Sequence, residues 1–469
     1  MYCPPAAASL LARGVAYTVA LAGLAALVVA ALPASVPPAA GAPVAEPVAD
    51  GDVSSSAPAA DDEGDSQVGL ARWTTAADWA GGEADGLWPL PGTHAGVVMT
   101  APAGTRDYTD PHTGRNATWE YSTWTSPVTD AGLGATELIA SWNASTPHGT
   151  WISVELQGTY SDGTTTPWYT MGVWASGDGA IKRTSVDDQS DGRSTVLTDT
   201  VAVTDADSGV RIDAHQLRLT LHRAPGSLAT PRVWGLTVMA SDVPERFAVE
   251  PSEGGIAWGT ELDVPRRSQN IHAGSYPEYG GGGAVWCSPA STTMVMEYYG
   301  VTPSNDDMAW IEPGYTDPQV AHAARMTWDH EYGGAGNWPF NTAYAAAVGG
   351  LDAFVTRLGS LDDVERLIAA GIPVVTSQSF RQDELDGAGY DTNGHLFVVV
   401  GFTDDGDVIV NDPASPSNET VRRVYQREQF EQVWLRTQRR TADGETAGGS
   451  GGVAYVIHPV DEALPAALL

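Results

Sequence analysis

Alternating apolar and polar residues between about Val68 and Ser241 are the feature that most constrains the fold of this chain. Glycine, aspartate, asparagine and proline separate these stretches at intervals of roughly ten to twenty residues, and no stretch shows a convincing helical period. Successive side chains of a strand point to opposite faces, so the pattern predicts half-buried strands. We therefore expect an all-β, sandwich-like accessory domain over residues 68–245. The clearest predicted strands are 136–142, 150–157, 170–175, 195–201 and 216–222.

Six tryptophans of this region allow two interpretations. If their rings are exposed together, they form a face on which sugars could stack. If they alternate with polar residues along strands, they are core residues and cross-strand partners, and we favour this second interpretation. The six residues are Trp119, Trp124, Trp142, Trp151, Trp168 and Trp174.

Beyond a boundary near residues 242–251 the pattern changes to alternating helices and strands, which predicts a second, α+β domain over residues 255–469. Residues 361–370 have the clearest helical pattern, with acidic residues in the first turn and Gly371 after the end. The other predicted helices are 288–299, 319–326, 341–348 and 427–434. The predicted strands are 373–377, 395–402, 407–411 and 453–458, with a hairpin turn at 403–406.

The chain is strongly acidic. It contains 24 Lys and Arg residues against 58 Asp and Glu residues, which gives a formal net charge of −34. Such a surface repels phosphate backbones and anionic lipids, so we exclude nucleic-acid binding and polybasic membrane binding. An acidic surface also keeps a secreted protein soluble.

Residues 1–42 have the order of a secretory signal peptide: Arg13, a nearly unbroken apolar run and then small residues. Prolines end the apolar run, which favours secretion over the alternative of a retained membrane anchor. Residues 43–67 are rich in alanine, proline, serine, glycine and acid, and they predict a disordered linker. We therefore expect a secreted, extracellular protein without a membrane contact after signal removal, and association with the cell wall is an open alternative.

Cys287 is the one cysteine that would remain after signal removal, because the other is Cys3. Four glycines at 280–283 precede it, and a helix is predicted to begin at once, with Pro289 in the first turn. A thiol at a helix N-terminus meets the positive end of the helix dipole and free N–H groups, which favour a thiolate and can hold an oxyanion. The glycines would let a substrate backbone come close. The alternative is a buried cysteine that begins a core helix.

His395 begins an apolar predicted strand, where a polar ring needs a partner or a task. Asp412 ends the next predicted strand, so the two side chains can meet if the hairpin is staggered or bulged. Asp412 could then orient the imidazole, and the imidazole could deprotonate Cys287. Taken singly, His395 could be a satisfied core histidine and Asp412 a turn residue before Pro413. The three residues together favour a catalytic set.

The order Cys, His, Asp on these elements resembles papain-like cysteine peptidases. It is more closely similar to the bacteriocin-leader-processing peptidases, cysteine peptidase family thirty-nine, and their secreted relatives of Gram-positive bacteria. The matching segments are 286–289 (Trp-Cys-Ser-Pro), 333–341, 392–395 (Thr-Asn-Gly-His) and 410–414 (Val-Asn-Asp-Pro-Ala), within about 261–459. The resemblance implies a papain-like fold for the second domain, with Cys287 as nucleophile, His395 as general base and Asp412 as the orienting carboxylate.

The resemblance also implies a glutamine before the cysteine that completes the oxyanion hole, and Gln269 is the match. It lies eighteen positions before Cys287, whereas the family has a much shorter gap. The additional residues 270–285 could loop outward, because a longer loop adds little closure entropy.

The implied function is that of a secreted thiol hydrolase, which cleaves peptide or amide bonds of a peptide, protein or cell-wall peptide through an acyl-thioester. Two alternatives stay open: acyl transfer by the same three residues, and a catalytically inactive protein that binds a substrate or the cell wall. His272, His322 and His330 are not at metal-ligand spacing, so we predict no metal and no cofactor. Because the candidate catalytic residues all follow the boundary, we expect a chain beginning near Gly255 to fold and hydrolyse small peptides by itself.

Overall fold

The computed structural model describes residues 67–92 and 94–466. The predicted signal peptide and, apart from Gln67, the predicted linker lie outside the described residues. Within the described part of the chain, no helix combines the length and the apolar character needed to cross a membrane.

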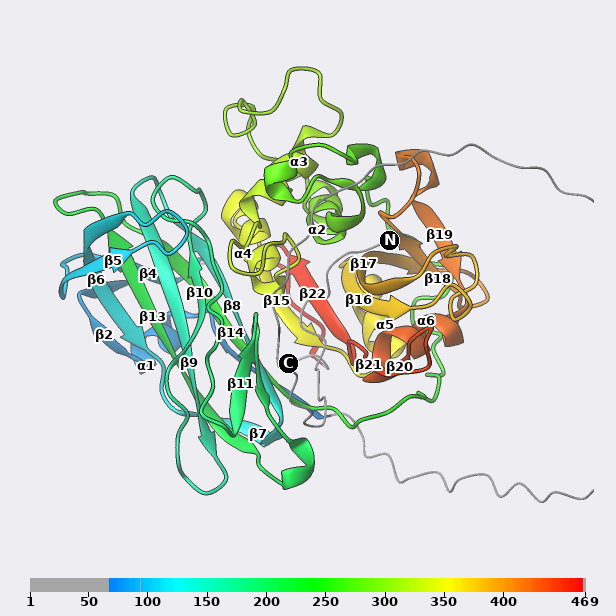
Figure 1. Cartoon of the computed structure of the whole chain (residues 1–469), viewed down its shortest axis with the longest axis horizontal. Helices are drawn as coiled ribbons and strands as arrows, with labels where there is room; N and C mark the ends of the chain where they lie inside the picture. The colour runs from blue at the N-terminus through cyan, green and yellow to red at the C-terminus, as the bar shows by residue number, and fades with distance from the viewer. Residues whose placement is uncertain (1–66, 93, 467–469) are drawn as a thin grey trace, which may run out of the picture. The chain divides into compact units, whose positions relative to one another are not determined.

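Strands dominate the N-terminal half of the described chain (Figure 1), where they form two antiparallel sheets of seven strands each. The first has the order β11-β12-β8-β14-β4-β3, with β1 beside β14, and its strands are β1 Gln67–Trp73, β3 Leu87–Leu90, β4 Gly96–Met99, β8 Glu137–Ser145, β11 Ser194–Leu197, β12 Thr200–Val203 and β14 Arg232–Asp242. The second has the order β10-β9-β13-β6-β2, with β5 beside β6 and β7 beside β13, and its strands are β2 Glu83–Asp85, β5 Gly104–Thr109, β6 Asn116–Thr125, β7 Thr129–Ala135, β9 Thr150–Tyr160, β10 Tyr169–Trp174 and β13 Ile212–Arg223. Two short helices, α1 Ala76–Gly81 and η1 Ala206–Ser208, complete this half.

Side chains of both sheets enter one hydrophobic core, which includes Trp142 from β8 and Leu217 from β13. Five of the six tryptophans considered above are buried. Trp168 is the partly exposed one, and the guanidinium of Arg218 lies 4.4 Å from its ring centroid. The six tryptophans therefore do not form a sugar-stacking face, and the core interpretation holds for the five buried ones.

Two local details of this half differ from the sequence predictions. Residues 195–201 were predicted as one strand but form the hairpin of β11 and β12, because Thr198 adopts a φ of 57° and turns the chain. Helix α1 was not predicted. Its first turn is closed by a capping box in which the side chain of Thr75 accepts a hydrogen bond from the N–H of Asp78, and the side chain of Asp78 accepts one from Thr75.

The C-terminal half is built on a six-stranded antiparallel sheet with the order β15-β22-β16-β17-β18-β19. Its strands are β15 Asp352–Arg357, β16 Val374–Phe380, β17 Thr392–Phe402, β18 Val408–Asn411, β19 Arg422–Tyr425 and β22 Val453–His458, while β20 Gln438–Arg440 and β21 Thr446–Gly448 pair separately. The helices are α2 Cys287–Tyr298, α3 Pro318–Met326, α4 Trp338–Gly349, α5 Leu361–Ala369 and α6 Arg427–Leu435, with short 3-10 helices η2 Asn270–His272, η3 Pro277–Tyr279, η4 Gly283–Val285 and η5 Asn418–Thr420. Strands β15, β19, β20 and β21 were not predicted from the sequence.

Strand β17 shows how this sheet is covered on both faces. Leu396 and Val398 belong to a hydrophobic cluster with residues of α2 and α4. Phe397 and Val399 belong to another cluster with residues of α5 and α6. Because successive side chains of a strand alternate between faces, α2 and α4 cover one face and α5 and α6 the other.

Helix α4 also packs against the strand-rich half. Phe340 and Ala343 of α4 belong to the core cluster of the two seven-stranded sheets, and Phe340 is completely buried. The backbone N–H of Trp338, the first residue of α4, donates a hydrogen bond of 2.9 Å to Asp199 in the β11–β12 turn. This shared core argues against the expectation that a chain beginning near Gly255 folds by itself, because that chain would expose Phe340 to water.

Candidate active site

Cys287 begins helix α2 and is completely buried. The glycines before it, Gly280 to Gly283, have φ values between 58° and 83°, which disfavour residues with a Cβ. A Cβ on Gly282 would overlap the carbonyl oxygen of His272. The glycines are therefore required by the tight folding of residues 270–285 on themselves, a role that differs from the predicted close approach of a substrate.

The sulfur of Cys287 is disulfide-bonded in this structure. The expectation of a single thiol concerns the chain without its signal peptide, and Cys3 lies outside the described residues, so this expectation stays a prediction. A nucleophilic role requires the reduced form of Cys287, because the thiolate is the nucleophile.

The first turns of α2 are held by hydrogen bonds to two strands of the six-stranded sheet. The hydroxyls of Ser288 and Tyr455 on β22 lie 2.9 Å apart. Ser291, one turn after Cys287, donates a hydrogen bond of 3.2 Å to the carbonyl oxygen of Leu396. The start of α2 is thereby fixed against the part of β17 that carries His395.

His395 and Asp412 are joined by a hydrogen bond of 2.9 Å between Nε2 of the imidazole and Oδ1 of the carboxylate. Strands β17 and β18 form the predicted hairpin, and their register shifts between Val399 and Gly401. This irregularity lets Asp412, directly after β18, reach the side chain of His395. Both side chains are almost completely buried. With Nε2 occupied, Nδ1 is the nitrogen left for proton transfer.

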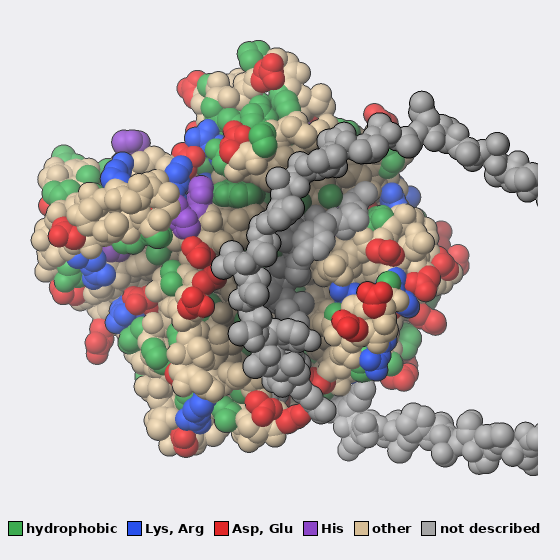
Figure 2. Space-filling model, in the orientation of Figure 1, with side chains coloured by type: hydrophobic (Ala, Val, Ile, Leu, Met, Phe, Trp, Pro, Cys, Tyr) green, Lys and Arg blue, Asp and Glu red, His purple; other side chains and the backbone are tan. Residues whose placement is uncertain are grey.

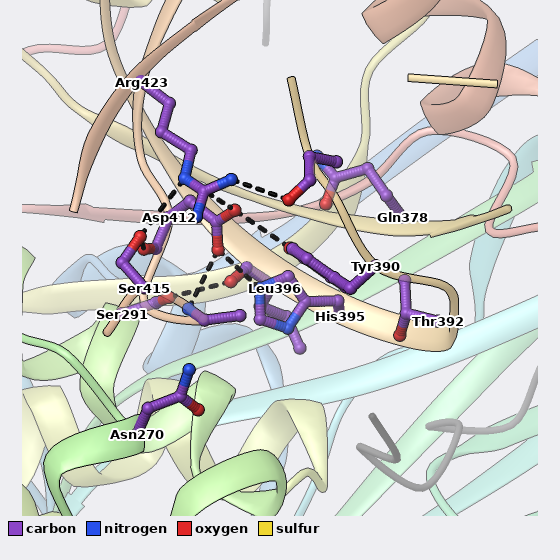
Figure 3. A network of polar contacts seen from close by, with 12 residues as sticks. Asn270, Ser291, Gln378, Tyr390, Thr392, His395, Leu396, Asp412, Ser415 and Arg423 are labelled. Carbon is purple, nitrogen blue, oxygen red and sulfur yellow. Dashed lines mark hydrogen bonds and ion pairs between the residues drawn. The ribbon is translucent and has the colours of Figure 1, made fainter. Parts of the chain in front are cut away.

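Asp412 accepts further hydrogen bonds from groups that the sequence analysis did not identify (Figure 3). The hydroxyls of Tyr390 and Tyr425 each donate to Oδ2 at 2.9 Å, and Figure 3 shows Tyr390 beside Asp412. The backbone N–H of Ala414 donates to Oδ1 at 2.9 Å, and Nε of Arg423 lies 3.7 Å from Oδ2. Tyrosines in a loop and at a strand end carry no local sequence signal for this role.

Burial alone would raise the pKa of Asp412. This effect of burial is outweighed by three neighbours: His395 through its hydrogen bond and charge, Arg423 through its charge, and Ala414 through its N–H. The pKa of the Asp412 carboxyl is therefore held below its usual value. Asp412 is therefore ionised at neutral pH, although it is completely buried.

Gln269 lies beside this pair despite its distance from Cys287 in the sequence. Its backbone N–H donates a hydrogen bond of 2.9 Å to the carbonyl oxygen of Pro413, the residue after Asp412. The neighbouring Ser268 donates from its backbone N–H to Asn418 at 2.7 Å. The Gln269 side chain is completely buried, and within the described residues neither its amide nitrogen nor its amide oxygen has a hydrogen-bond partner.

Other residues considered above have structural roles. Asn337 caps α4, because its side-chain oxygen accepts a hydrogen bond of 3.1 Å from the N–H of Phe340. His272 and His322 each contact a tyrosine hydroxyl, at 2.8 and 2.9 Å. Burial lowers the pKa of each of these two histidines to about 4. The described part of the chain contains no group of three or more side chains arranged to hold a metal ion.

Comparisons with known proteins match both halves of the chain. A family model described as the peptidase C39 N-terminal domain matches residues 69–241, and one described as the peptidase C39 like family matches residues 261–442. No curated protein matches the chain. A solved structure of a candidate C39-like peptidase from Bacillus anthracis is 19% identical over 42% of this chain and 96% of that chain, with a TM-score of 0.26.

Proposed function

Because this chain belongs to the C39 family of papain-like cysteine peptidases, we propose that it hydrolyses peptide bonds with Cys287 as nucleophile, His395 as general base and Asp412 as the orienting carboxylate. The 2.9 Å hydrogen bond between His395 and Asp412 carries this proposal, together with the position of Cys287 at the start of a helix held against β17. A helix N-terminus and a neighbouring imidazole both favour a thiolate.

The proposed reaction begins with reduced Cys287. Its sulfur attacks the carbonyl carbon of the peptide bond while its proton passes to Nδ1 of His395. The resulting oxyanion receives hydrogen bonds from the backbone N–H of Cys287 and from the side-chain amide of Gln269. When the C–N bond breaks, the imidazolium returns the proton to the leaving amine, and an acyl-thioester remains.

Water completes the cycle. His395 takes a proton from the water as it attacks the thioester carbonyl, and a second oxyanion forms. The carboxylic acid then leaves as the C–S bond breaks, and the imidazolium returns the proton to the Cys287 sulfur. Asp412 keeps the imidazole in one orientation through both steps and stabilises the imidazolium by its charge.

The proposed substrate is a peptide, a protein or a cell-wall peptide outside the cell. The predicted signal peptide motivates the extracellular location, and the net charge of −34 opposes polyanionic ligands. The two seven-stranded sheets would form the sandwich-like accessory domain, which anchors the enzyme or presents the substrate.

The test uses the full chain under reducing conditions with a broad peptide library. We expect hydrolysis that iodoacetamide abolishes. Cys287→Ala and His395→Ala should also abolish it, and Asp412→Ala should retain more activity, because an orienting group is less essential than the groups that react. His148→Ala, an exposed histidine of the strand-rich half, is the matched control and should keep full activity. Hydrolysis that persists in Cys287→Ala would contradict the proposal.

A further inference from the structure

Two tyrosine hydroxyls converge on one oxygen of Asp412. Tyr390 and Tyr425 each donate to Oδ2 at 2.9 Å, while His395 is bound to the other oxygen, Oδ1. Each carboxylate oxygen therefore has two donors, since the N–H of Ala414 also donates to Oδ1. Figure 3 shows His395 of β17 and Tyr390 of the segment before β17 on the same side of the network as Asp412.

The two tyrosines come from different parts of the fold. Tyr425 ends β19 and is completely buried. Tyr390 lies in the connection between β16 and β17 and is partly buried. Burial raises the pKa of both phenols far above the usual value, so each hydroxyl keeps its proton and acts as a donor.

The connection that carries Tyr390 is held in place by Arg423 of β19. Nη1 of Arg423 donates to the carbonyl oxygens of Gly387 and Ala388 at 2.9 and 2.7 Å. Nε of the same side chain donates to the hydroxyl of Ser415 at 3.2 Å. Arg423 thus links the Tyr390 segment, the Asp412 segment and β19, with its charge 3.7 Å from Oδ2.

A buried carboxylate needs such donors. Transfer of a charged group from water into a protein interior is costly unless hydrogen bonds and opposite charges replace the lost hydration. Arg423 is the cation that faces Asp412, and His395 adds a second positive charge only when it is protonated. The two phenols are the neutral groups that replace water at Oδ2.

We propose that Tyr390 and Tyr425 are positioning residues for the catalytic pair: they keep Asp412 ionised and hold its Oδ1 toward His395. The inference rests on the proposed function, in which the imidazole must be oriented to receive the proton of Cys287. Tyr390 is supplied by a connecting segment, so the segment 381–391 belongs to the catalytic apparatus through this single hydroxyl.

The test compares Tyr390→Phe, Tyr425→Phe and the double variant with wild type in the reduced full chain. Phenylalanine keeps the ring and removes only the donor. Hydrogen bonds to a charged acceptor are strong, so the loss of each hydroxyl should raise the pKa of Asp412. Protonated Asp412 cannot stabilise the imidazolium, so the acidic limb of activity should move to higher pH.

Two measurements report this shift without a substrate. The first is the rate of Cys287 alkylation by iodoacetamide as a function of pH. The second is the titration of the His395 ring nitrogens by ¹⁵N NMR. We expect the acidic limb of the alkylation rate to move upward by about one pH unit or more in the double variant, with a smaller shift in each single variant. Tyr298→Phe, a tyrosine at the far end of α2, is the matched control and should leave both curves unchanged.

An acidic limb that stays at the wild-type pH in a folded double variant would overturn the proposal. A shift of equal size in Tyr298→Phe would also overturn it, because the effect would then be general. Failure of wild type to hydrolyse any peptide would contradict the proposed function instead, and the alkylation and NMR curves would still decide the role of the tyrosines.

Discussion

At the scale of single residues, the buried side-chain amide of Gln269 lowers the stability of the folded chain. Its side-chain amide is completely buried, and among the described residues neither amide atom has a hydrogen-bond partner. A buried polar group left in this state costs about 1–3 kcal/mol. The backbone bond to Pro413 places the residue beside Asp412, which agrees with a donor kept free for an oxyanion.

Replacement of Gln269 by methionine should therefore separate activity from stability. Methionine has a similar volume and no donor, so kcat should fall by roughly 10²–10³ while KM and the alkylation rate of Cys287 change little. The melting temperature should stay the same or rise, because an unpaired polar group is removed. Peptide hydrolysis, alkylation and thermal unfolding are measured on the same sample. A loss below about threefold would exclude the oxyanion role and favour Asn270 or a backbone N–H.

At the scale of elements, the turn between β11 and β12 is coupled to helix α4. Asp199 in this turn accepts the backbone N–H of Trp338 at 2.9 Å and the hydroxyl of Thr200 at 3.1 Å. Burial, with a smaller contribution from the charge of the nearby Asp329, raises the pKa of Asp199 to about 7 against the effect of these two donors. The folded chain thus binds this proton more tightly than the unfolded chain does.

The resulting pH dependence can be measured with Asp199→Asn, which keeps an acceptor oxygen for Trp338. Asp199 contributes most to the free energy of unfolding below its unfolded pKa, and this contribution is lost as pH rises toward its folded pKa of about 7. The variant should therefore gain stability relative to wild type by up to about 1.4 kcal/mol per pH unit across that interval. Urea unfolding at several pH values between 4 and 8 measures the difference. A difference that does not change with pH would show that Asp199 is ionised throughout.

The sequence predicted elements best where local patterns agree with the final packing. Helices α2, α3 and α5 lie within one residue of the predicted bounds, because their periodicity and end signals are local. Strand β15 was missed because all of its residues are buried and it has no alternation. The hairpin at Thr198 was missed because a positive φ in a β-branched residue has no local signal.

At the scale of the whole molecule, the resemblance to the C39 family is confirmed by the family matches. The short motifs around Cys287, His395 and Asp412 were recognisable because each residue lies at or near the end of a predicted element. The contacts of Tyr390 and Tyr425 were not, since they depend on the register of three strands and on a connecting segment. The packing of α4 on the N-terminal sheets was also not predictable. An apolar residue such as Phe340 is equally compatible with packing inside the C-terminal half and with packing against the N-terminal sheets.

The shared core leads to a prediction about truncation. A chain that begins at Gly255 would expose Phe340, whose burial is worth about 1.5–3 kcal/mol. It would also lose the hydrogen bonds from Nη2 of Arg72 to both carboxylate oxygens of Asp352, at 2.7 and 2.6 Å, and the hydrogen bond from the Val249 N–H to Gln432, at 2.8 Å. We expect this chain to melt at a lower temperature than a chain that begins at Gln67, to bind a hydrophobic dye and to lose peptide hydrolysis.

The chain from Gln67 is the matched control, because it keeps the strand-rich half. Addition of Phe340→Ser to the shorter chain should reduce dye binding, since it removes the exposed ring. If the two chains melted at the same temperature and hydrolysed peptides equally, the packing of α4 would contribute nothing, and the C-terminal half would be an independent enzyme.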